Sequence, residues 1–162
     1  MIGNDVVDLK LAATESDWKR TGYLDKIFTS VEQEFIFNAK NKTEMVWVLW
    51  SIKESVYKAS LRIDYDRGFY PSKIEITSLK KKGSEYNSII KLKRKSFHAL
   101  SKIAGGCIHT IATNFDYQLS NVYNLESNTP YFKDENGLPL DYSNNYISIS
   151  HHGNFKKIIC YR

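Results

Sequence analysis

The chain has 162 residues, of which 42% are hydrophobic, so it can bury the core of one domain. It contains no apolar run near the ~20 residues of a membrane-spanning helix, and its start lacks the basic-then-apolar layout of a signal peptide. A formal net charge of +5 favours an anionic partner and leaves nucleic acid, an acidic protein and a phosphorylated small molecule open. We expect a cytoplasmic protein whose two distant cysteines, Cys107 and Cys160, are reduced thiols.

The N-terminal part is predicted to hold one strand and two helices. The opening "IGNDVVDLKLA" interleaves apolar residues with acids, which is typical of a short strand. Thr14 is a candidate N-cap for a helix over "ESDWKR", and Thr29 or Ser30 for a helix over "VEQEFIFNAK". Glu32 and Glu34 would then lie in a first turn, where the helix dipole favours acids. The apolar residues of this second helix recur four apart: Val31, Phe35 and Ala39.

A third helix is predicted over residues 43–61. Its apolar residues fall on one stripe: Leu49, Ile52, Val56 and Ala59. Ser51, Glu54 and Lys58 share the other side, so the helix is amphipathic. Glu54 and Lys58 could form a surface ion pair worth about 0.2–0.5 kcal/mol. The alternative is a metal-binding carboxylate beside a phosphate-binding amine, and the spacing alone does not choose between them.

From residue 73 onward the pattern predicts strands. Alternating and β-branched residues indicate strands at 73–79, 87–97 and 106–115, and a weaker one at 121–127. Residues 145–162 indicate two short strands around His151–Asn154. A strand, then helices, then strands favour an α+β fold over a doubly wound parallel sheet. The chain has no linker or internal repeat, so residues 1–162 are expected to form a single domain.

Two acids are candidate metal ligands. Asp5 lies in an otherwise apolar strand, and Mg²⁺ is typically held by one or two carboxylates with phosphate oxygens and water. Asp5 and Glu54 would suffice if the third helix packs beside the first strand; otherwise Asp5 simply faces solvent. The chain lacks the glycine-rich phosphate loops and the nucleophile elbow, so its motifs give no support to the common nucleotide folds and disfavour a triad hydrolase. His151 and His152 are adjacent, hence point in opposite directions on a strand, and make a poor zinc pair.

Taken in order, four segments resemble the signature of the 4′-phosphopantetheinyl transferase superfamily. They are "IGNDVVDL" at the N-terminus, "FTSVEQ", "WSIKESVYKA" and the late "SISHH", which follows a Gly-x-Pro turn at 137–139. The resemblance covers nearly the whole chain. It implies the single-repeat fold of that family, in which an antiparallel sheet packs against helices. It also implies transfer of the phosphopantetheine arm from coenzyme A to a serine of an apo carrier protein, with release of 3′,5′-ADP.

The resemblance also assigns roles to individual residues. Asp5 and Glu54 would hold the Mg²⁺ that bridges the coenzyme A diphosphate. Lys58 would bind the diphosphate, with help from Lys53, and Glu54 or a metal-bound water would take the proton of the carrier serine. Ser150 and His151 match the serine and histidine of the family's late strand, which contacts coenzyme A. The resemblance therefore implies that both residues contact coenzyme A.

Two features bear on the type of enzyme within the family. Val7 stands where larger members often carry a further acid, which resembles the short holo-acyl-carrier-protein-synthase type of fatty acid biosynthesis. That type works as a homotrimer with shared active sites. The present chain is longer, and residues 80–133 resemble a strand-rich insertion, so the sequence leaves the trimer open.

The basic residues form two clusters, Lys80–Lys82 and Lys91–Lys95, and either could bind the acidic helix of an acyl or peptidyl carrier protein. A non-catalytic relative that binds coenzyme A or a carrier protein is the alternative function. A nucleic-acid-binding domain is a third reading, which we disfavour because the aromatic residues follow core periodicity instead of interleaving with the basic clusters. We expect neither nucleic acid nor a membrane as a partner.

Overall fold

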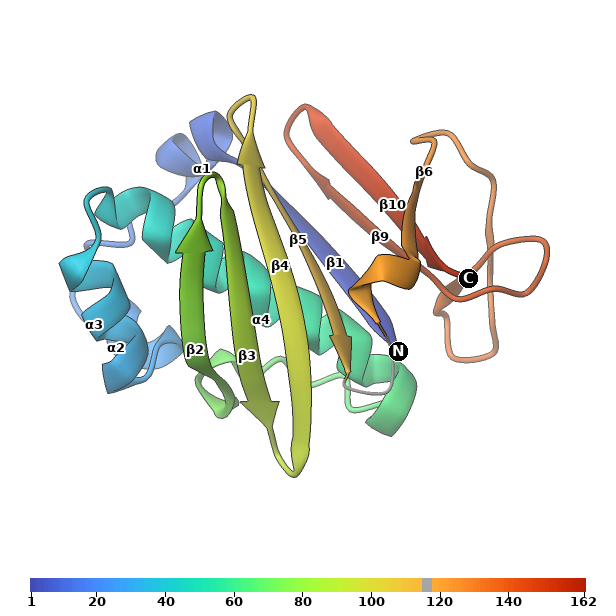
Figure 1. The fold of residues 1–162 in the computed structure, drawn as a ribbon, viewed down its shortest axis with the longest axis horizontal. Coiled ribbons are helices and arrows are strands. Elements are labelled where there is room, and N and C mark those ends of the chain that lie inside the picture. The colour runs from blue at the N-terminus through green and yellow to red at the C-terminus, as the bar shows by residue number, and fades with distance from the viewer. Residues whose placement is uncertain (115–117) are drawn as a thin grey trace.

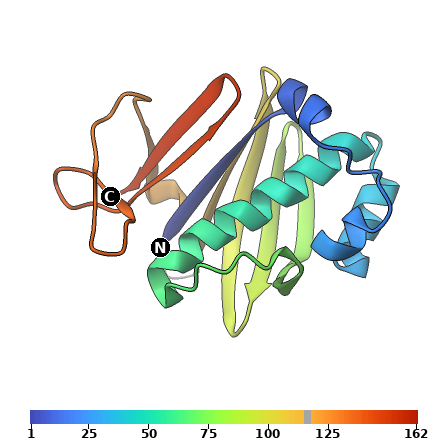
Figure 2. The same cartoon turned by 180° about the vertical axis from the view of Figure 1, so that it is seen from behind.

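The protein is described from a computed structural model, for residues 1–114 and 118–162. Helix α4 (Lys42–Asp64) lies across one face of a five-stranded sheet with the order β1-β5-β4-β3-β2 (Figures 1 and 2). All neighbouring strands are antiparallel, and their bounds are β1 Ile2–Asp8, β2 Ile74–Lys82, β3 Glu85–Leu92, β4 Lys95–Ala104 and β5 Cys107–Asn114. The α+β architecture with an antiparallel sheet is confirmed.

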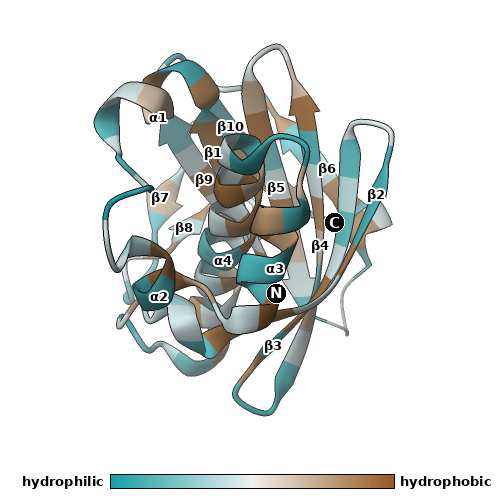
Figure 3. Cartoon of the chain, turned by 90° about the vertical axis from the view of Figure 1, so that its left-hand side faces the viewer, coloured by the Kyte–Doolittle hydropathy of each residue, from teal (hydrophilic) through white to brown (hydrophobic). Residues whose placement is uncertain are grey.

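The core lies between α4 and the sheet. Helix α4 contributes a fully buried stripe of Leu49, Ile52, Val56 and Ala59, as the sequence predicted. The sheet contributes residues that alternate inward and outward, and hydrophobic and hydrophilic colours alternate along β2 in Figure 3. Ser51 is a correction, because it is buried and its hydroxyl donates to Thr110 Oγ1 at 2.9 Å instead of facing an open polar side.

Three short helices, α1 (Leu9–Glu15), α2 (Tyr23–Ile27) and α3 (Ser30–Asn38), precede α4. Thr29 caps α3 as predicted, through a capping box with Glu32. The cap at Thr14 is wrong: α1 begins earlier because the Asp8 carboxylate accepts the first free N–H groups of that helix. The buried face of α3 is also different from the prediction, since Val31 is 49% exposed whereas Glu32 and Ile36 are buried.

A second sheet lies beside β1 and consists of β6 (Val122–Leu125), β10 (Phe155–Tyr161) and β9 (Ile147–His152). It occupies the opposite end of the molecule from α2 and α3 (Figures 1 and 2). The pair β7 (Phe132–Lys133) and β8 (Pro139–Leu140) and the short 3₁₀ helices Pro71–Lys73 and Leu119–Asn121 complete the described elements. No helix in residues 1–114 and 118–162 has the length and hydropathy needed to cross a bilayer.

The contact between the two sheets is made by side chains. Three alternate residues of β9 accept N–H groups from three alternate residues of β1: Ser148 from Asn4 at 2.9 Å, Ser150 from Val6 at 3.0 Å and His152 from Asp8 at 2.8 Å. Within residues 1–114 and 118–162 no strand pairs with β1 on that side, so these bonds satisfy three N–H groups of its free edge. The C-terminal hairpin is thereby held in register with the first strand.

One strand prediction differs from the structure, and the end of another lies outside the described residues. Residues 87–97 form a hairpin instead of one strand, because β3 ends at Leu92 and a two-residue turn at Lys93 and Arg94 precedes β4. Lys93 has φ of 55°, a conformation that turns normally assign to glycine or asparagine, and neither residue marks the turn in the sequence. Phe115, at the end of the predicted strand 106–115, lies outside the described residues.

The stretch expected as an insertion, residues 80–133, has two parts in the structure. Residues 80–114 belong to β2, β3, β4 and β5, hence to the main sheet that covers α4. Within the rest, the described residues 118–133 form a 3₁₀ helix and β6 and lead to β7 of the C-terminal region. Both cysteines are buried and free.

Candidate active site

Strand β1 crosses α4 at very short range because residue 3 is glycine. A Cβ atom built on Gly3 would overlap the Ser55 carbonyl oxygen and the Ala59 backbone nitrogen. Side chains two apart on a strand share a face, so Asp5 lies on the same side of β1 as Gly3, toward α4. The "GND" tripeptide thus both permits the close packing and places a carboxylate beside the helix.

The Asp5 carboxylate is 8% exposed and has two charged or polar partners. Lys58 Nζ on α4 lies 3.3 Å from Asp5 Oδ1 and also donates to the Asn4 carbonyl oxygen at 2.9 Å. Ser150 Oγ on β9 donates to Asp5 Oδ1 at 3.0 Å. Asp5 is therefore the point where β1, α4 and β9 meet.

A cavity of about 560 Å³ opens at this junction. One stripe of α4 forms a wall of it, with residues at spacings of three, four and four: Trp47, Trp50, Glu54 and Lys58. Asp5, Ser150 and His151 contribute from the two strands. The structure thus brings together five of the predicted site residues. The two tryptophans were missed, although their spacing to Glu54 and Lys58 was a readable signal.

Glu54 lies where its charged form is disfavoured. Burial raises the pKa of Glu54, the negative charge of Asp5 raises that pKa further, and the Lys58 ammonium opposes both effects. Two carboxylates therefore have one lysine between them, so their negative charge is not fully balanced and a bound cation would stabilise it. The described residues contain no group of three or more histidine, cysteine or acidic side chains, so a metal here would have two protein carboxylates. This donor set fits Mg²⁺, which keeps water and takes phosphate oxygens as further ligands.

Lys53 requires a correction, because the structure places it away from the cavity. Its side chain is fully buried, and its ammonium lies 2.8 Å from Glu32 Oε1 and 2.9 Å from the Pro71 carbonyl oxygen, with a third bond to the Ile74 carbonyl. All three N–H donors are used. Lys53 therefore joins α4 to α3 and to the start of β2, and it has no donor left for coenzyme A.

The three late polar residues of β9 differ in position. His151 is exposed at the cavity wall, where a ligand can reach it. Ser150 is 5% exposed, and its hydroxyl is engaged with Asp5 and with the Val6 N–H, so its nearest partner is the carboxylate. His152 accepts the Asp8 N–H at Nδ1, and its Nε2 lies 3.1 Å from Glu15 Oε2.

The two basic clusters have different surroundings. Lys93 and Lys95 form ion pairs with Asp64, and Lys93 also with Asp66, so local acids offset the charge of two of the four basic residues in that cluster. The clusters lie at opposite ends of β2 and β3, since residues 80–82 end β2 and residue 91 lies near the end of β3. The described acids form no salt bridge with Lys80, Lys81 or Lys82.

Comparison with known proteins bears on the family and the fold of the chain. The family model of the 4′-phosphopantetheinyl transferase superfamily matches residues 1–112. The apo-ACPS structure of Chronobacterium ammoiniagenes shares the fold, with a TM-score of 0.51 and 15% identity over 69% of this chain and 93% of that chain. No curated protein matches the sequence. Asp5, Glu54 and Lys58 all lie inside the matched residues, and the chain belongs to the 4′-phosphopantetheinyl transferase superfamily.

Proposed function

We propose that this protein transfers the 4′-phosphopantetheine arm of coenzyme A to a serine of an apo acyl carrier protein and releases 3′,5′-ADP. The observation that carries the proposal is the meeting of Asp5, Glu54 and Lys58 in one solvent-open cavity of about 560 Å³. A module that only binds has no need of two carboxylates in one cavity, where burial and the charge of Asp5 raise the pKa of Glu54. We propose a holo-acyl-carrier-protein-synthase type of enzyme, acting in the cytoplasm in fatty acid biosynthesis.

Asp5 and Glu54 are the residues that would hold Mg²⁺. The metal would supply positive charge to the coenzyme A diphosphate, where negative charge develops during phosphoryl transfer. Asp5 is held by Ser150 and Lys58, so its carboxylate is already oriented toward the cavity. Such pre-orientation lowers the cost of binding a cation that demands near-ideal geometry.

Lys58 is the candidate for binding a phosphate oxygen. Its side chain is 27% exposed and reaches the cavity, where its ammonium pairs with Asp5 and lowers the pKa of Glu54. The exposed His151 is placed to contact coenzyme A from the opposite strand. Ser150 acts on Asp5 in this proposal, and Lys53 takes no part.

Glu54 is the candidate base, directly or through a metal-bound water. Glu54 lies on the cavity wall beside Asp5 and Lys58, where its carboxylate can take a proton from a substrate hydroxyl. The oxygen of the carrier serine forms a bond to the phosphorus next to the pantetheine arm, and the phosphorus–oxygen bond to the 3′,5′-ADP leaving group breaks. The serine proton goes to Glu54, so the step balances.

Mass spectrometry of a recombinant apo acyl carrier protein tests this proposal. With the protein, coenzyme A and Mg²⁺ we expect the carrier to gain about 340 Da, the mass of the arm, and EDTA should abolish the gain. The Glu54→Gln variant serves as the inactive control. Binding of coenzyme A without any gain on several acyl and peptidyl carriers would favour a non-catalytic relative. Sedimentation of the same sample measures whether the protein is the homotrimer expected for the short type.

A further inference from the structure

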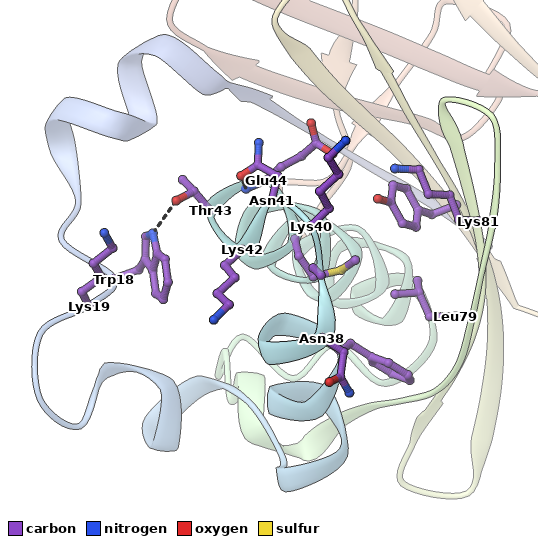
Figure 4. A pocket seen from close by; sticks show the side chains of 14 residues that line it. Trp18, Lys19, Asn38, Lys40, Asn41, Lys42, Thr43, Glu44, Leu79 and Lys81 are labelled. Atoms are coloured by element: carbon purple, nitrogen blue, oxygen red, sulfur yellow. Dashed lines mark hydrogen bonds between the residues drawn. The ribbon is translucent and has the colours of Figure 1, made fainter.

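A second cavity, of about 800 Å³, lies at the N-terminal end of α4 and is larger than the active-site cavity (Figure 4). It is bounded by α3, the start of α4, β2, β3 and the segment around Trp18. Six apolar side chains of the main core form its floor: Trp18, Phe35, Ala39, Met45, Leu79 and Tyr86. Apolar surface of the core is thus open to a ligand at this end of the molecule.

The rim of this cavity is basic. Four exposed lysines line it: Lys19, Lys40, Lys42 and Lys81. Glu44 is the single acid among the described residues of the lining, and within residues 1–114 and 118–162 no acid forms a salt bridge with any of the four lysines. Figure 4 shows Lys40 and Lys81 directed toward the same side of the cavity and Lys42 directed away from them. The cavity therefore has unpaired positive charge at its edge, and two of the lysines face one side.

Lys81 is held above the floor by Tyr86. Its ammonium lies 5.0 Å from the centre of the Tyr86 ring. A hydrogen bond with the Tyr86 side chain raises the pKa of Lys81, so this lysine stays charged at neutral pH. A cation–π contact of this kind leaves the ammonium accessible to an anion. Positive charge and apolar surface therefore lie next to each other at this wall of the cavity.

The combination of rim and floor indicates the chemistry of the ligand. A small inorganic anion would meet the lysines but leave the apolar floor uncovered, and an uncharged hydrocarbon would cover the floor without using the lysines. An anion with a long apolar body does both. The floor also favours a flexible chain over a flat ring, because its residues come from five separate segments and include Met45, whose thioether side chain adapts to irregular shapes.

This cavity is separate from the active site. In the described part of the chain, the two cavities share no lining residue. Met45 and Glu54 are nine residues apart on α4, which is about 14 Å along the helix axis. A ligand can therefore occupy one cavity while the other stays free.

We propose that this second cavity binds a single-chain amphiphilic carboxylate, with its alkyl chain on the apolar floor and its carboxylate at Lys40 and Lys81. The inference goes beyond the proposed transfer reaction and does not depend on it. Ion pairs at exposed lysines contribute little in water, so most of the affinity comes from the chain. Each fully buried methylene improves the affinity about fourfold.

Methyl NMR of the protein with isotope-labelled methionine tests this site. The chain has two methionines, so the spectrum reports on Met45 in the cavity floor and on Met1, whose amine donates to Asn114. We expect decanoate to shift the Met45 signal saturably, with a Kd on the order of 0.1–1 mM, and to leave the Met1 signal unchanged. Hexanoate, which is four methylenes shorter, should bind at least about tenfold more weakly. Inorganic phosphate should shift neither signal.

Variants assign the two ends of the ligand. Lys40→Gln/Lys81→Gln should weaken decanoate binding about fivefold or more at low salt and leave the binding of uncharged decanol nearly unchanged. Lys91→Gln/Arg94→Gln is the matched control, since it also removes two exposed positive charges, near the opposite end of β3, and should leave the Kd of decanoate unchanged. Leu79→Gln makes the floor more polar and should weaken decanoate and decanol alike.

Saturating coenzyme A with Mg²⁺ distinguishes this cavity from the active site. We expect decanoate to shift the Met45 signal with unchanged affinity in the presence of coenzyme A. Loss of that shift would place decanoate in the active site and overturn the inference, as would equal weakening by both charge variants or a phosphate-induced shift as large as that with decanoate. Absence of any decanoate binding would overturn it as well. Each of these results leaves the proposed transfer reaction standing, because that reaction is measured separately on a carrier protein.

Discussion

Ser150 Oγ donates a hydrogen bond of 3.0 Å to Asp5 Oδ1 while it accepts the N–H of Val6, the next residue of the same strand. Ser150 thus fixes both the side chain of Asp5 and the strand that carries it. Asp5 lies in the residues matched by the family model, whereas Ser150 lies beyond residue 112. The C-terminal hairpin therefore completes a site whose charged groups all come from the first 64 residues.

Replacing Ser150 should weaken metal binding. In Ser150→Ala, Asp5 loses the donor that orients it, and we expect Mg²⁺ or Mn²⁺ to bind about tenfold more weakly, as for other partners of metal ligands. Isothermal titration with Mn²⁺ measures this without any turnover. Ser150→Thr keeps the hydroxyl and should restore part of the affinity.

Ser148→Ala is the matched control for this measurement. Ser148 makes the equivalent bond to the N–H of Asn4 but does not touch Asp5. A general loosening of the hairpin would lower the metal affinity of both alanine variants alike. Weakening confined to Ser150→Ala is the outcome that identifies Ser150 as a positioning residue for Asp5.

Glu54→Gln should separate activity from stability. We expect turnover to fall at least about 100-fold, since the base and one metal ligand are lost. The raised pKa of Glu54 means that the folded, metal-free protein holds a proton there above the pH at which the unfolded chain releases it. The stability that protonated Glu54 contributes to the fold is therefore lost as the pH rises through its raised pKa. The glutamine variant has no proton to release at this position, so its stability does not change in this way.

Thermal unfolding in EDTA at pH 5 and pH 7 measures the effect on stability. From pH 5 to pH 7, the melting temperature of the wild type should fall relative to that of Glu54→Gln. A glutamine variant that is clearly less stable than wild type at pH 7 would contradict the assignment of Glu54 to an electrostatically costly position.

The spacing along the helix predicted that Glu54 and Lys58 share a face, and the family resemblance added Asp5; the structure brings the three residues to one cavity. The sequence did not predict the direction of Lys53, which depends on the ring of acceptors that α3 and the Pro71–Lys73 turn build around it. Nor did it predict the turn at Lys93, where no glycine marks the chain reversal. The direction of Lys53 depends on contacts between segments far apart in the sequence. The turn at Lys93 depends on a backbone conformation that the residue type does not predict.

Lys53→Met should destabilise the protein strongly, although the residue is adjacent to Glu54. The substitution leaves the Glu32 carboxylate buried with only the Thr29 and Ile76 N–H donors, and removing one member of a buried pair costs about 3–5 kcal/mol. Urea unfolding measures the loss. The double variant Lys53→Met/Glu32→Gln removes the charge left behind and should recover part of it. A loss of turnover without a loss of stability would instead assign Lys53 to the active site.

His109 should make the protein less stable in mild acid. Burial, with the positive charge of Lys157, lowers the pKa of His109 to about 4, whereas the unfolded chain takes up this proton near pH 6.5. The unfolded state therefore binds more protons between these values, and stability falls as pH decreases through that window. We expect this group to cost about 1–2 kcal/mol between pH 7 and pH 5. His109→Gln should show a shallower pH dependence in urea unfolding, and an unchanged slope would contradict the assignment.

Gly3→Ala should damage the fold and the metal site together. The added methyl would meet backbone atoms of α4 at Ser55 and Ala59, which no side-chain rotation can relieve, so β1 must move away from the helix. Overpacking of this kind costs about 1–3 kcal/mol, and the shift carries Asp5 away from Lys58. We expect a lower urea midpoint and Mn²⁺ affinity reduced more than in Ser150→Ala. Since β1 also carries the Asn4, Val6 and Asp8 donors to β9, the same displacement would loosen the C-terminal hairpin, which increased amide exchange in residues 147–161 would reveal.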